Sequence, residues 1–379
     1  MRLTPSPEQS QYLRAVREVL DTDEVRAETA AARSRPGTEP GLLDVYRKLG
    51  ARSLLAPNWP AAYGGLGTGM AEKALLTEEL IARGIPDIAH TLTIDIVGLA
   101  VLRYGTDAQR ARLLPPLARG EGLAGVLFSE PDAGSDLAAL RTRAVPDGDG
   151  WRLTGTKVYS AKTHLAGFAL CAARTTPSDV GMHGITVFLV PLDSPGVRVS
   201  PLRAIGTDRF NRVELGGIRL TRDDVLGEAD EGWQLIGEVL GLERTGVEFR
   251  AKARYWLDTA LGSLTGDDAA AHADRLVALD AEVRAAGLLA WRCVNDLDAG
   301  SPDALHSATA KYAAGETARA VALAAADLCG PDALLAADDP DAPGDVLEAA
   351  VREAPGLTLA SGTSEVMLTL IASGLGLPG

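Results

Sequence analysis

The sequence predicts an α+β fold with an N-terminal helical domain, a small central antiparallel β domain and a C-terminal four-helix bundle. Apolar residues recur at helical spacing at both ends of the chain, and short β-prone runs separated by Gly, Pro and Asp turns fill the middle. The length of 379 residues suits two or three domains of about 150 residues each, so a large core can form. We therefore expect domains at residues 1–122, 123–227 and 228–379.

The first domain has three segments with the apolar spacing of helices: Ala71–Arg83, Thr91–Tyr104 and Asp107–Ala118. Gly and Pro residues predict breaks at Arg35–Gly41, Pro57–Gly69 and Gly84–Pro86. Ordinary core packing accounts for all three helices, so no functional role follows from them.

Six β-prone runs follow: Gly125–Ser129, Gly150–Leu153, Lys157–Ser160, Phe168–Ala173, Ile185–Pro191 and Asn211–Leu215. Apolar alternation in Ile185–Val190 and the turn sequence at Pro146–Gly150 favour antiparallel pairing.

Helical spacing returns after Gly227, with long Ala-rich segments at Asp268–Asp298 and Pro302–Cys329 that have the length of bundle helices. A Pro/Asp/Gly-rich loop is expected at Gly330–Gly344, before a final helix pair around Gly356 and Gly362.

The composition argues against several classes of partner. The charge sum is 37 minus 51, or −14, and no Lys/Arg run provides a surface for nucleic acid. Apolar stretches such as Ile96–Leu102 are far shorter than the roughly 18 residues of a spanning helix, so no membrane segment is expected. The N-terminus lacks the apolar core of a signal peptide, which favours a cytoplasmic location. The three cysteines and five histidines are widely spaced, so neither a disulfide framework nor a metal site is expected.

The segment Gly125–Asp136 (GVLFSEPDAGSD) is the first candidate for chemistry. A strand runs into a turn in which Pro131 keeps Glu130 extended, and such a turn exposes backbone N–H groups. Together with Ser129 and Ser135, these groups can bind a polar ring edge or a pyrophosphate. A polar hairpin exit explains the same pattern.

Tyr159 is the second candidate, because it stands between two strand-like runs in a protein with only 4% aromatic residues. A flat side chain there can stack on a ring system. The alternative is a core residue or a partner in a strand-face pair.

Glu243 is the third candidate. Within a predicted helix over Gly232–Ala253, it interrupts an apolar stripe formed by Ile236, Leu240 and Val247. A buried carboxylate must be paired, protonated or functional. Otherwise the stripe reaches the surface at Glu243. Arg244 can pair with Glu248 at a spacing of four residues.

These segments, taken in order, resemble the acyl-CoA dehydrogenase family of flavoproteins over nearly the whole chain. The matching motifs are Tyr63-Gly-Gly-Leu-Gly67, Tyr104-Gly-Thr with Leu113-Leu-Pro-Pro-Leu-Ala-Arg-Gly120, Ser129-Glu-Pro-Asp-Ala-Gly-Ser-Asp136, Gly155-Thr-Lys157, Leu226-Gly, Gly232-Trp, Leu242-Glu-Arg244 and Gly362-Thr-Ser-Glu365. A single glycine motif is weak, but the ordered set is specific.

The resemblance implies FAD bound between the β domain and the bundle. It implies that Val126, Phe128 and Ser129 line the flavin edge, that Tyr159 stacks on the ring, and that Ser135 lies near the cofactor or the thioester's pantetheine. Ala161 replaces the threonine that usually bonds the flavin, which leaves only its backbone N–H. Three further residues are implied at the cofactor: Gly362, Thr363 and Glu365.

The same resemblance implies the α,β-dehydrogenation of an acyl thioester, with the β-hydride passing to flavin N5. Many members carry the catalytic glutamate just before Gly-Thr, where this chain has Ser361. Others place it at the position of Glu243, which we therefore expect to remove the α-proton. The Ser361 backbone N–H would polarise the thioester carbonyl, and Arg244 would also contact substrate.

The resemblance also implies two partners. One is an acyl-CoA or acyl-carrier-protein thioester of fatty acid or specialised metabolism as the substrate, and the other is an electron-transfer flavoprotein. Met367-Leu368-Thr369 replaces the family's Gln-Arg-Asn, and the Arg-xx-Phe-Gly segment that reaches a neighbouring FAD is absent near Gly262–Asp267. Three assemblies therefore stay open: a homo-oligomer (dimer or tetramer), a heteromer with a second dehydrogenase-like subunit, and a non-catalytic subunit that completes a partner's FAD site.

Overall fold

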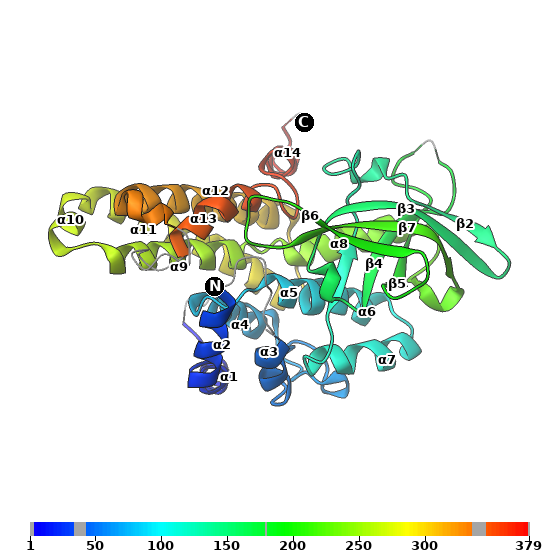
Figure 1. The fold of residues 1–379 in the computed structure, drawn as a ribbon, viewed down its shortest axis with the longest axis horizontal. Helices are drawn as coiled ribbons and strands as arrows, with labels where there is room; N and C mark the ends of the chain where they lie inside the picture. The colour runs from blue at the N-terminus through cyan, green and yellow to red at the C-terminus, as the bar shows by residue number, and fades with distance from the viewer. Residues whose placement is uncertain (1–3, 34–42, 179, 336–345, 378–379) are drawn as a thin grey trace.

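The computed structural model describes residues 4–33, 43–178, 180–335 and 346–377, and it has helices at both ends of the chain and one sheet in the middle. Figure 1 shows the long C-terminal helices on one side, the sheet on the other, and the N-terminal helices beneath both. The α+β prediction is confirmed.

The N-terminal helices are α1 (Pro7–Leu20), α2 (Asp23–Arg33), α3 (Leu43–Gly50), α4 (Met70–Ala82), α5 (Ile88–His90), α6 (Leu99–Tyr104) and α7 (Asp107–Ala118), with a short 3₁₀ turn at Ala61–Tyr63. Two of the predicted helices correspond to α4 and α7. The third, Thr91–Tyr104, is helical throughout, but residues Thr91–Gly98 form a π-helix that is buried along its whole length. A Cβ at Gly98 would lie 2.0 Å from the buried Trp59 ring, so glycine is required for this contact. The predicted break at Arg35–Gly41 lies outside the described residues.

The strands are β1 (Ala124–Leu127), β2 (Arg143–Asp147), β3 (Gly150–Ala161), β4 (Phe168–Arg174), β5 (Ile185–Pro191), β6 (Val197–Leu202), β7 (Phe210–Leu220) and β8 (Val225–Leu226). They form one sheet in the order β6-β7-β3-β2-β4-β5-β8, and β1 pairs with β4. Most pairs are antiparallel as predicted, but β1 runs parallel to β4, with Gly125 opposite Ala169. The two runs predicted at Gly150–Leu153 and Lys157–Ser160 are one continuous strand, β3. The sequence pattern does not predict β2, β6 and β8, because β8 has two residues and the other two strands contain proline and expose polar side chains.

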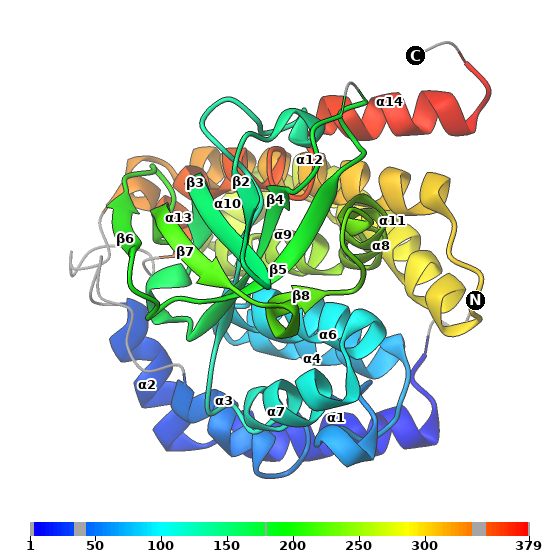
Figure 2. The same ribbon diagram turned by 90° about the vertical axis from the view of Figure 1, so that its right-hand side faces the viewer.

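The C-terminal helices are α8 (Gly232–Glu243), α9 (Val247–Ser263), α10 (Gly266–Ala271), α11 (Ala273–Asp298), α12 (Ala304–Cys329), α13 (Val346–Leu357) and α14 (Ser364–Gly374). Helices α9, α11, α12 and α13 share one apolar core, and α12 faces it with fully buried alanines that allow close packing. Figure 2 shows α14 outside this core, across the top of the molecule. The predicted loop at Gly330–Gly344 begins with a 3₁₀ turn at Pro331–Leu334, and its remainder from residue 336 lies outside the described residues.

The prediction of one helix over Gly232–Ala253 is wrong, because α8 ends at Glu243 and α9 begins at Val247. Gly246 between them has φ of 75°, and a Cβ there would lie 2.8 Å from the Ala310 carbonyl oxygen of α12. The break therefore results from the close packing of the chain on α12. It also means that Arg244 and Glu248 are not one helical turn apart.

We expect Gly246→Ala to lower the free energy of unfolding by about 1–3 kcal/mol, because alanine disfavours positive φ and would contact α12. Urea unfolding followed by circular dichroism measures this change. The matched control is Gly262→Ala in α9, where nothing lies within 4 Å of the added Cβ. That variant should keep or slightly raise stability, and equal losses in both variants would contradict the role of Gly246.

Candidate active site

Glu243 lies where α8 passes from the sheet to the bundle. The helix begins beside β5, where a Cβ on Gly232 would lie 2.8 Å from the Ile185 carbonyl oxygen, and Glu243 is its last residue. The Glu243 side chain is buried, with 8% of its surface exposed. The alternative that the apolar stripe reaches the surface at Glu243 is therefore wrong.

The side chain of Ser361 meets Glu243 across 118 residues of sequence. Ser361 Oγ donates a hydrogen bond of 2.6 Å to Glu243 Oε1. Arg244 Nε donates to the Ser361 carbonyl oxygen at 2.8 Å. Ser361 itself has φ of 56°, a strained value for a non-glycine residue. The arrangement brings together three of the residues singled out in the sequence: Glu243, Arg244 and Ser361.

Burial raises the pKa of Glu243, and three interactions oppose that rise: the hydrogen bond from Ser361 and the nearby charges of Arg244 and Lys73. Burial also raises the pKa of Glu248, at the start of α9, to about 7, against the opposing charge of Lys73. The buried acid thus lies among cations and a hydroxyl donor that make its ionised form accessible.

Lys73 belongs to a buried charged group that the sequence analysis missed. Its Nζ lies 3.1 Å from Asp95 Oδ2 on the π-helix, and both side chains are almost fully buried. His90 Nδ1 lies 3.8 Å from the same oxygen, while His90 Nε2 is 2.8 Å from the Leu55 carbonyl oxygen. The sequence signal was a single lysine within an otherwise apolar helix face. The segment that carries His90 and Asp95 is helical.

A second buried ion pair holds the turn that follows β1. Lys157 Nζ on β3 donates to Glu130 Oε1 at 2.8 Å and to the Phe128 carbonyl oxygen at 3.0 Å. The Glu130 carboxylate also accepts from the backbone N–H groups of Arg141 and Thr142. Burial alone would raise the pKa of Glu130, but the charge and hydrogen bond of Lys157 hold it below its ordinary value. The backbone at Phe128 and Ser129 is thereby fixed against β3.

Tyr159 lies beside that turn, and the residue is 66% exposed. The neighbouring Val158 N–H donates to the Ser129 carbonyl oxygen at 2.9 Å. The register of β3 against β7 shifts between Lys157 and Ser160, so Tyr159 occupies a β-bulge with φ of 56°. Because a bulge redirects side chains, the ring projects from the sheet. The alternative of a core tyrosine is wrong.

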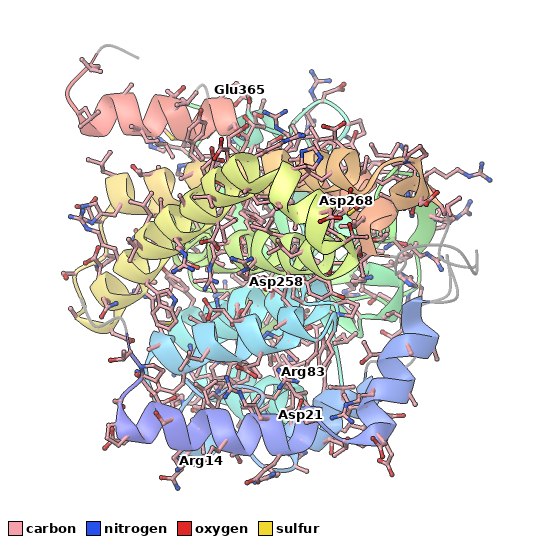
Figure 3. All side chains as sticks on the ribbon, turned by 90° about the vertical axis from the view of Figure 1, so that its left-hand side faces the viewer. Arg14, Asp21, Arg83, Asp258, Asp268 and Glu365 are labelled. Atoms are coloured by element: carbon pink, nitrogen blue, oxygen red, sulfur yellow. The ribbon has the colours of Figure 1, made fainter. Side chains whose placement is uncertain are left out.

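The remaining predicted site residues are less tightly grouped. Val126 on β1 is half-buried, Phe128 and Ala161 are buried, and Ser135 lies exposed on the loop after Glu130. Thr363 caps α14 by accepting from the Val366 N–H at 3.2 Å, and Glu365 in the first turn of α14 is exposed (Figure 3).

The projecting Tyr159 ring, the half-buried Val126 and the fixed backbone at Ser129 fit the edge and face of a flavin. An exposed aromatic ring held outside a strand ladder offers a stacking surface, and the main chain beside it offers hydrogen-bonding groups. Ala161 has no side-chain hydroxyl that could bond to a flavin.

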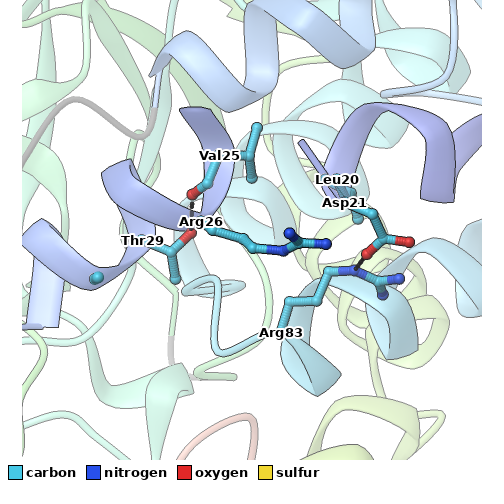
Figure 4. Close-up of a pocket in the computed structure, with 7 residues that line it drawn as sticks. Leu20, Asp21, Val25, Arg26, Thr29 and Arg83 are labelled. Carbon is cyan, nitrogen blue, oxygen red and sulfur yellow. Dashed lines mark hydrogen bonds and ion pairs between the residues drawn. The ribbon is translucent and has the colours of Figure 1, made fainter. Parts of the chain in front are cut away.

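A cavity of about 220 Å³ lies elsewhere, between α1 and α2, and is lined in part by Arg26, Thr29 and Arg83. In Figure 4, Arg83 meets Asp21 at the edge of this cavity, with a distance of 2.7 Å between Nε and Oδ1. None of the predicted site residues lines it. In the described ranges, no three His, Cys, Asp or Glu residues are grouped to hold a metal, and no helix is long and apolar enough to span a membrane.

We expect Lys157→Met to lower the free energy of unfolding by about 3–5 kcal/mol, because it leaves the Glu130 carboxylate buried without its cation. Urea unfolding, with and without added FAD, measures the change. The control is Arg152→Met, whose partner Asp147 is part of an exposed pair. That control should change stability by less than about 1 kcal/mol. A stable Lys157→Met variant would show that this ion pair does not hold the turn.

Three family models match the chain in order. They describe the N-terminal, middle and C-terminal domains of acyl-CoA dehydrogenases and cover residues 6–121, 125–217 and 230–376. Two solved structures with similar folds are the ChsE4-ChsE5 complex from Mycobacterium tuberculosis and the Tcur3481-Tcur3483 steroid ACAD. They share 27% and 26% identity with this chain, have TM-scores of 0.86 and 0.88, and are covered over 100% of both chains.

Among curated proteins, acyl-CoA dehydrogenase FadE34 of Mycobacterium tuberculosis is 42% identical over 50% of this chain. The match spans only 27% of FadE34, and 61% and 62% of the related FadE29 and FadE26. Glutaryl-CoA dehydrogenase of Desulfococcus multivorans is 30% identical over 72% of this chain and 74% of its own length. With three family models in order and this long match, the chain belongs to the acyl-CoA dehydrogenase family.

Proposed function

We propose that this protein is an FAD-dependent acyl thioester dehydrogenase in which Glu243 removes the α-proton. The observation that carries the proposal is the hydrogen bond of 2.6 Å between Ser361 and Glu243. It places a buried carboxylate beside the residue that precedes Gly-Thr, where other family members carry their glutamate. Two segments distant in sequence thus form one site: α8 supplies the proposed base, and Ser361 supplies the hydroxyl group that bonds to it.

The chain provides both groups that α-proton removal needs. A thioester α-carbon is too weakly acidic for a carboxylate unless the carbonyl is polarised. The Ser361 N–H is the proposed donor to that carbonyl, and Arg244 holds the next peptide group along the chain by binding the Ser361 carbonyl oxygen. Ser361 Oγ orients the carboxylate of Glu243. Burial raises the proton affinity of this carboxylate toward that of an effective base.

Residues of the β domain would hold the cofactor: Tyr159 as the stacking ring, with Val126, Phe128 and Ser129 along the flavin edge. When bound, FAD supplies the oxidant that takes up the β-hydrogen with its electron pair. The side chains of Glu130 and Lys157 keep the backbone at that edge in place.

We expect Glu243→Gln to keep bound FAD but to slow flavin reduction by substrate roughly 10²- to 10⁴-fold, because glutamine cannot accept the proton. Stopped-flow bleaching of the flavin absorbance under anaerobic conditions measures this rate.

The control is Glu248→Gln, which removes a second buried acid near Lys73. It should retain most of the rate. Fast bleaching in Glu243→Gln, or a loss confined to Glu248→Gln, would exclude Glu243 as the base.

A second candidate is a subunit that shares its cofactor site with a different dehydrogenase-like chain. It is favoured by the similarity to the ChsE4-ChsE5 complex and by the exposure of Leu368 and Leu370 on α14 and of Leu375 directly after it. Met367, at the position of the family's glutamine, is fully buried and packs against Gly362. It therefore offers no polar group for the distant half of FAD.

We expect the purified chain to be yellow, with close to one FAD released per chain on denaturation, if it is a self-sufficient dehydrogenase. Visible absorption before and after denaturation measures this ratio. A colourless chain that takes up FAD only after mixing with a companion subunit would establish the second candidate instead. Acyl-CoA and carrier-bound substrates, with electron-transfer flavoprotein as acceptor, are the partners to compare.

A further inference from the structure

Lys311 of α12 is a buried cation that the proposed mechanism leaves unexplained. Only 1% of its surface is exposed. Within the described part of the chain, no carboxylate lies within ion-pairing distance of its Nζ. A buried ammonium group without a counterion is costly, so its contacts must be strong.

The Lys311 ammonium bonds to both ends of the segment that carries Ser361. Its Nζ donates to the Gly362 carbonyl oxygen at 2.6 Å and to the Leu357 carbonyl oxygen at 3.4 Å. Leu357 is the last residue of α13, where carbonyl groups lack helical partners and the helix dipole favours a cation. The ammonium also lies 5.6 Å from the centre of the Phe249 ring.

The segment between these two carbonyls is strained. The strain lies at Ser361, a non-glycine residue with φ of 56°, and the next residue, Gly362, has φ of 99°, which glycine adopts readily. Arg244 binds the Ser361 carbonyl oxygen and Lys311 binds the next one, at Gly362. Two adjacent peptide groups are thus held by two cations, Arg244 directly after α8 and Lys311 in α12. The first of these groups follows Ser361, whose side-chain hydroxyl reaches Glu243.

We propose that Lys311 is a positioning residue for the base, acting through the Leu357–Thr363 segment to keep the Ser361 hydroxyl and N–H in place. The inference rests on the proposed role of Glu243. Lys311 contacts neither the carboxylate nor, in this proposal, the substrate. Its loss should therefore lower the rate of proton removal without lowering cofactor content.

The arrangement also makes the segment sensitive to pH. Burial and the charge of Arg244 lower the pKa of Lys311 to about 8, from an ordinary 10.5. Neutral lysine donates weaker hydrogen bonds to carbonyls, so the segment should loosen above this pH. The charged groups that act on Lys311 come from α8, α9, α12 and α14: Glu243, Arg244, Glu248, Glu316 and Glu365.

The direction in which pH changes the free energy of unfolding distinguishes this positioning role from a purely structural one. Because the folded-state pKa lies below the unfolded value, the unfolded chain binds more protons between pH 8 and 10.5. Loss of the Lys311 proton therefore does not reduce global stability. Activity should fall above about pH 8 while this group causes no loss of thermal stability.

The first test follows flavin reduction and the melting temperature of the wild-type protein between pH 7 and 10, beside Lys311→Arg and Lys311→Met. We expect Lys311→Met to be slower by about tenfold or more at pH 7, with its FAD content unchanged. Lys311→Arg should retain activity and move the alkaline decline to higher pH, because arginine stays protonated. An alkaline decline at the same pH in wild type and Lys311→Arg would overturn the proposal.

The second test measures hydrogen exchange of the 358–364 peptide in the wild type at pH 7 and pH 9, corrected for intrinsic exchange. The comparison between the two pH values uses only the wild-type protein. Faster exchange at pH 9 supports the proposal, and equal protection overturns it. The control is Arg250→Met, which loses an ion pair with Glu78 on α4 and should leave this peptide protected.

If Glu243→Gln reduces flavin normally, the proposed base is wrong, whereas wild-type speed in Lys311→Met refutes only the positioning role.

Discussion

The close contact between Gly246 and the backbone of α12 sets the geometry on which the candidate site depends. A side chain at 246 would meet Ala310, and the positive φ there ends one helix and starts the next. Glu243 consequently lies at the C-terminal end of α8, where Arg244 is free to turn toward Ser361. Lys311 directly follows Ala310, so the same few residues of α12 both exclude a side chain at 246 and hold the segment opposite Glu243.

Buried charges in this protein are balanced in two different ways. Lys157 and Lys73 meet carboxylates directly, and these pairs fasten one backbone element to another. Arg244 and Lys311 instead bond to carbonyl oxygens, so that among the residues the structure describes no cation is in direct hydrogen-bond contact with Glu243. A carboxylate in that situation keeps the raised proton affinity that burial gives it. A salt bridge from Glu243 to Arg244 or Lys311 would lower the proton affinity of the carboxylate again.

The sequence predicted much of the fold because local signals were strong. Apolar spacing identified α4, α7 and the long α11 and α12, and β-prone runs marked most of the sheet. It failed where tertiary contacts override local pattern. The break after Glu243 depends on α12, and the apolar spacing across it indicated one helix. For the site, family motifs indicated Glu243 and Ser361. Lys311 is an ordinary lysine in helical sequence, and Lys73 differs from one only in its mostly apolar helix face. Their burial depends on elements far along the chain.

The bulge at Tyr159 allows β3 to pair with β7 and also to present an exposed side chain. The hydrogen-bonded ladder between β3 and β7 closes on either side of Tyr159, at Lys157 and at Ser160. The ladder therefore needs no packing contact from the side chain at this position, although φ of 56° disfavours β-branched residues there. A strand built this way lets the residue facing outward change size or chemistry over evolution while the sheet keeps its register. Substitutions at that surface can accumulate without compensating substitutions in the core.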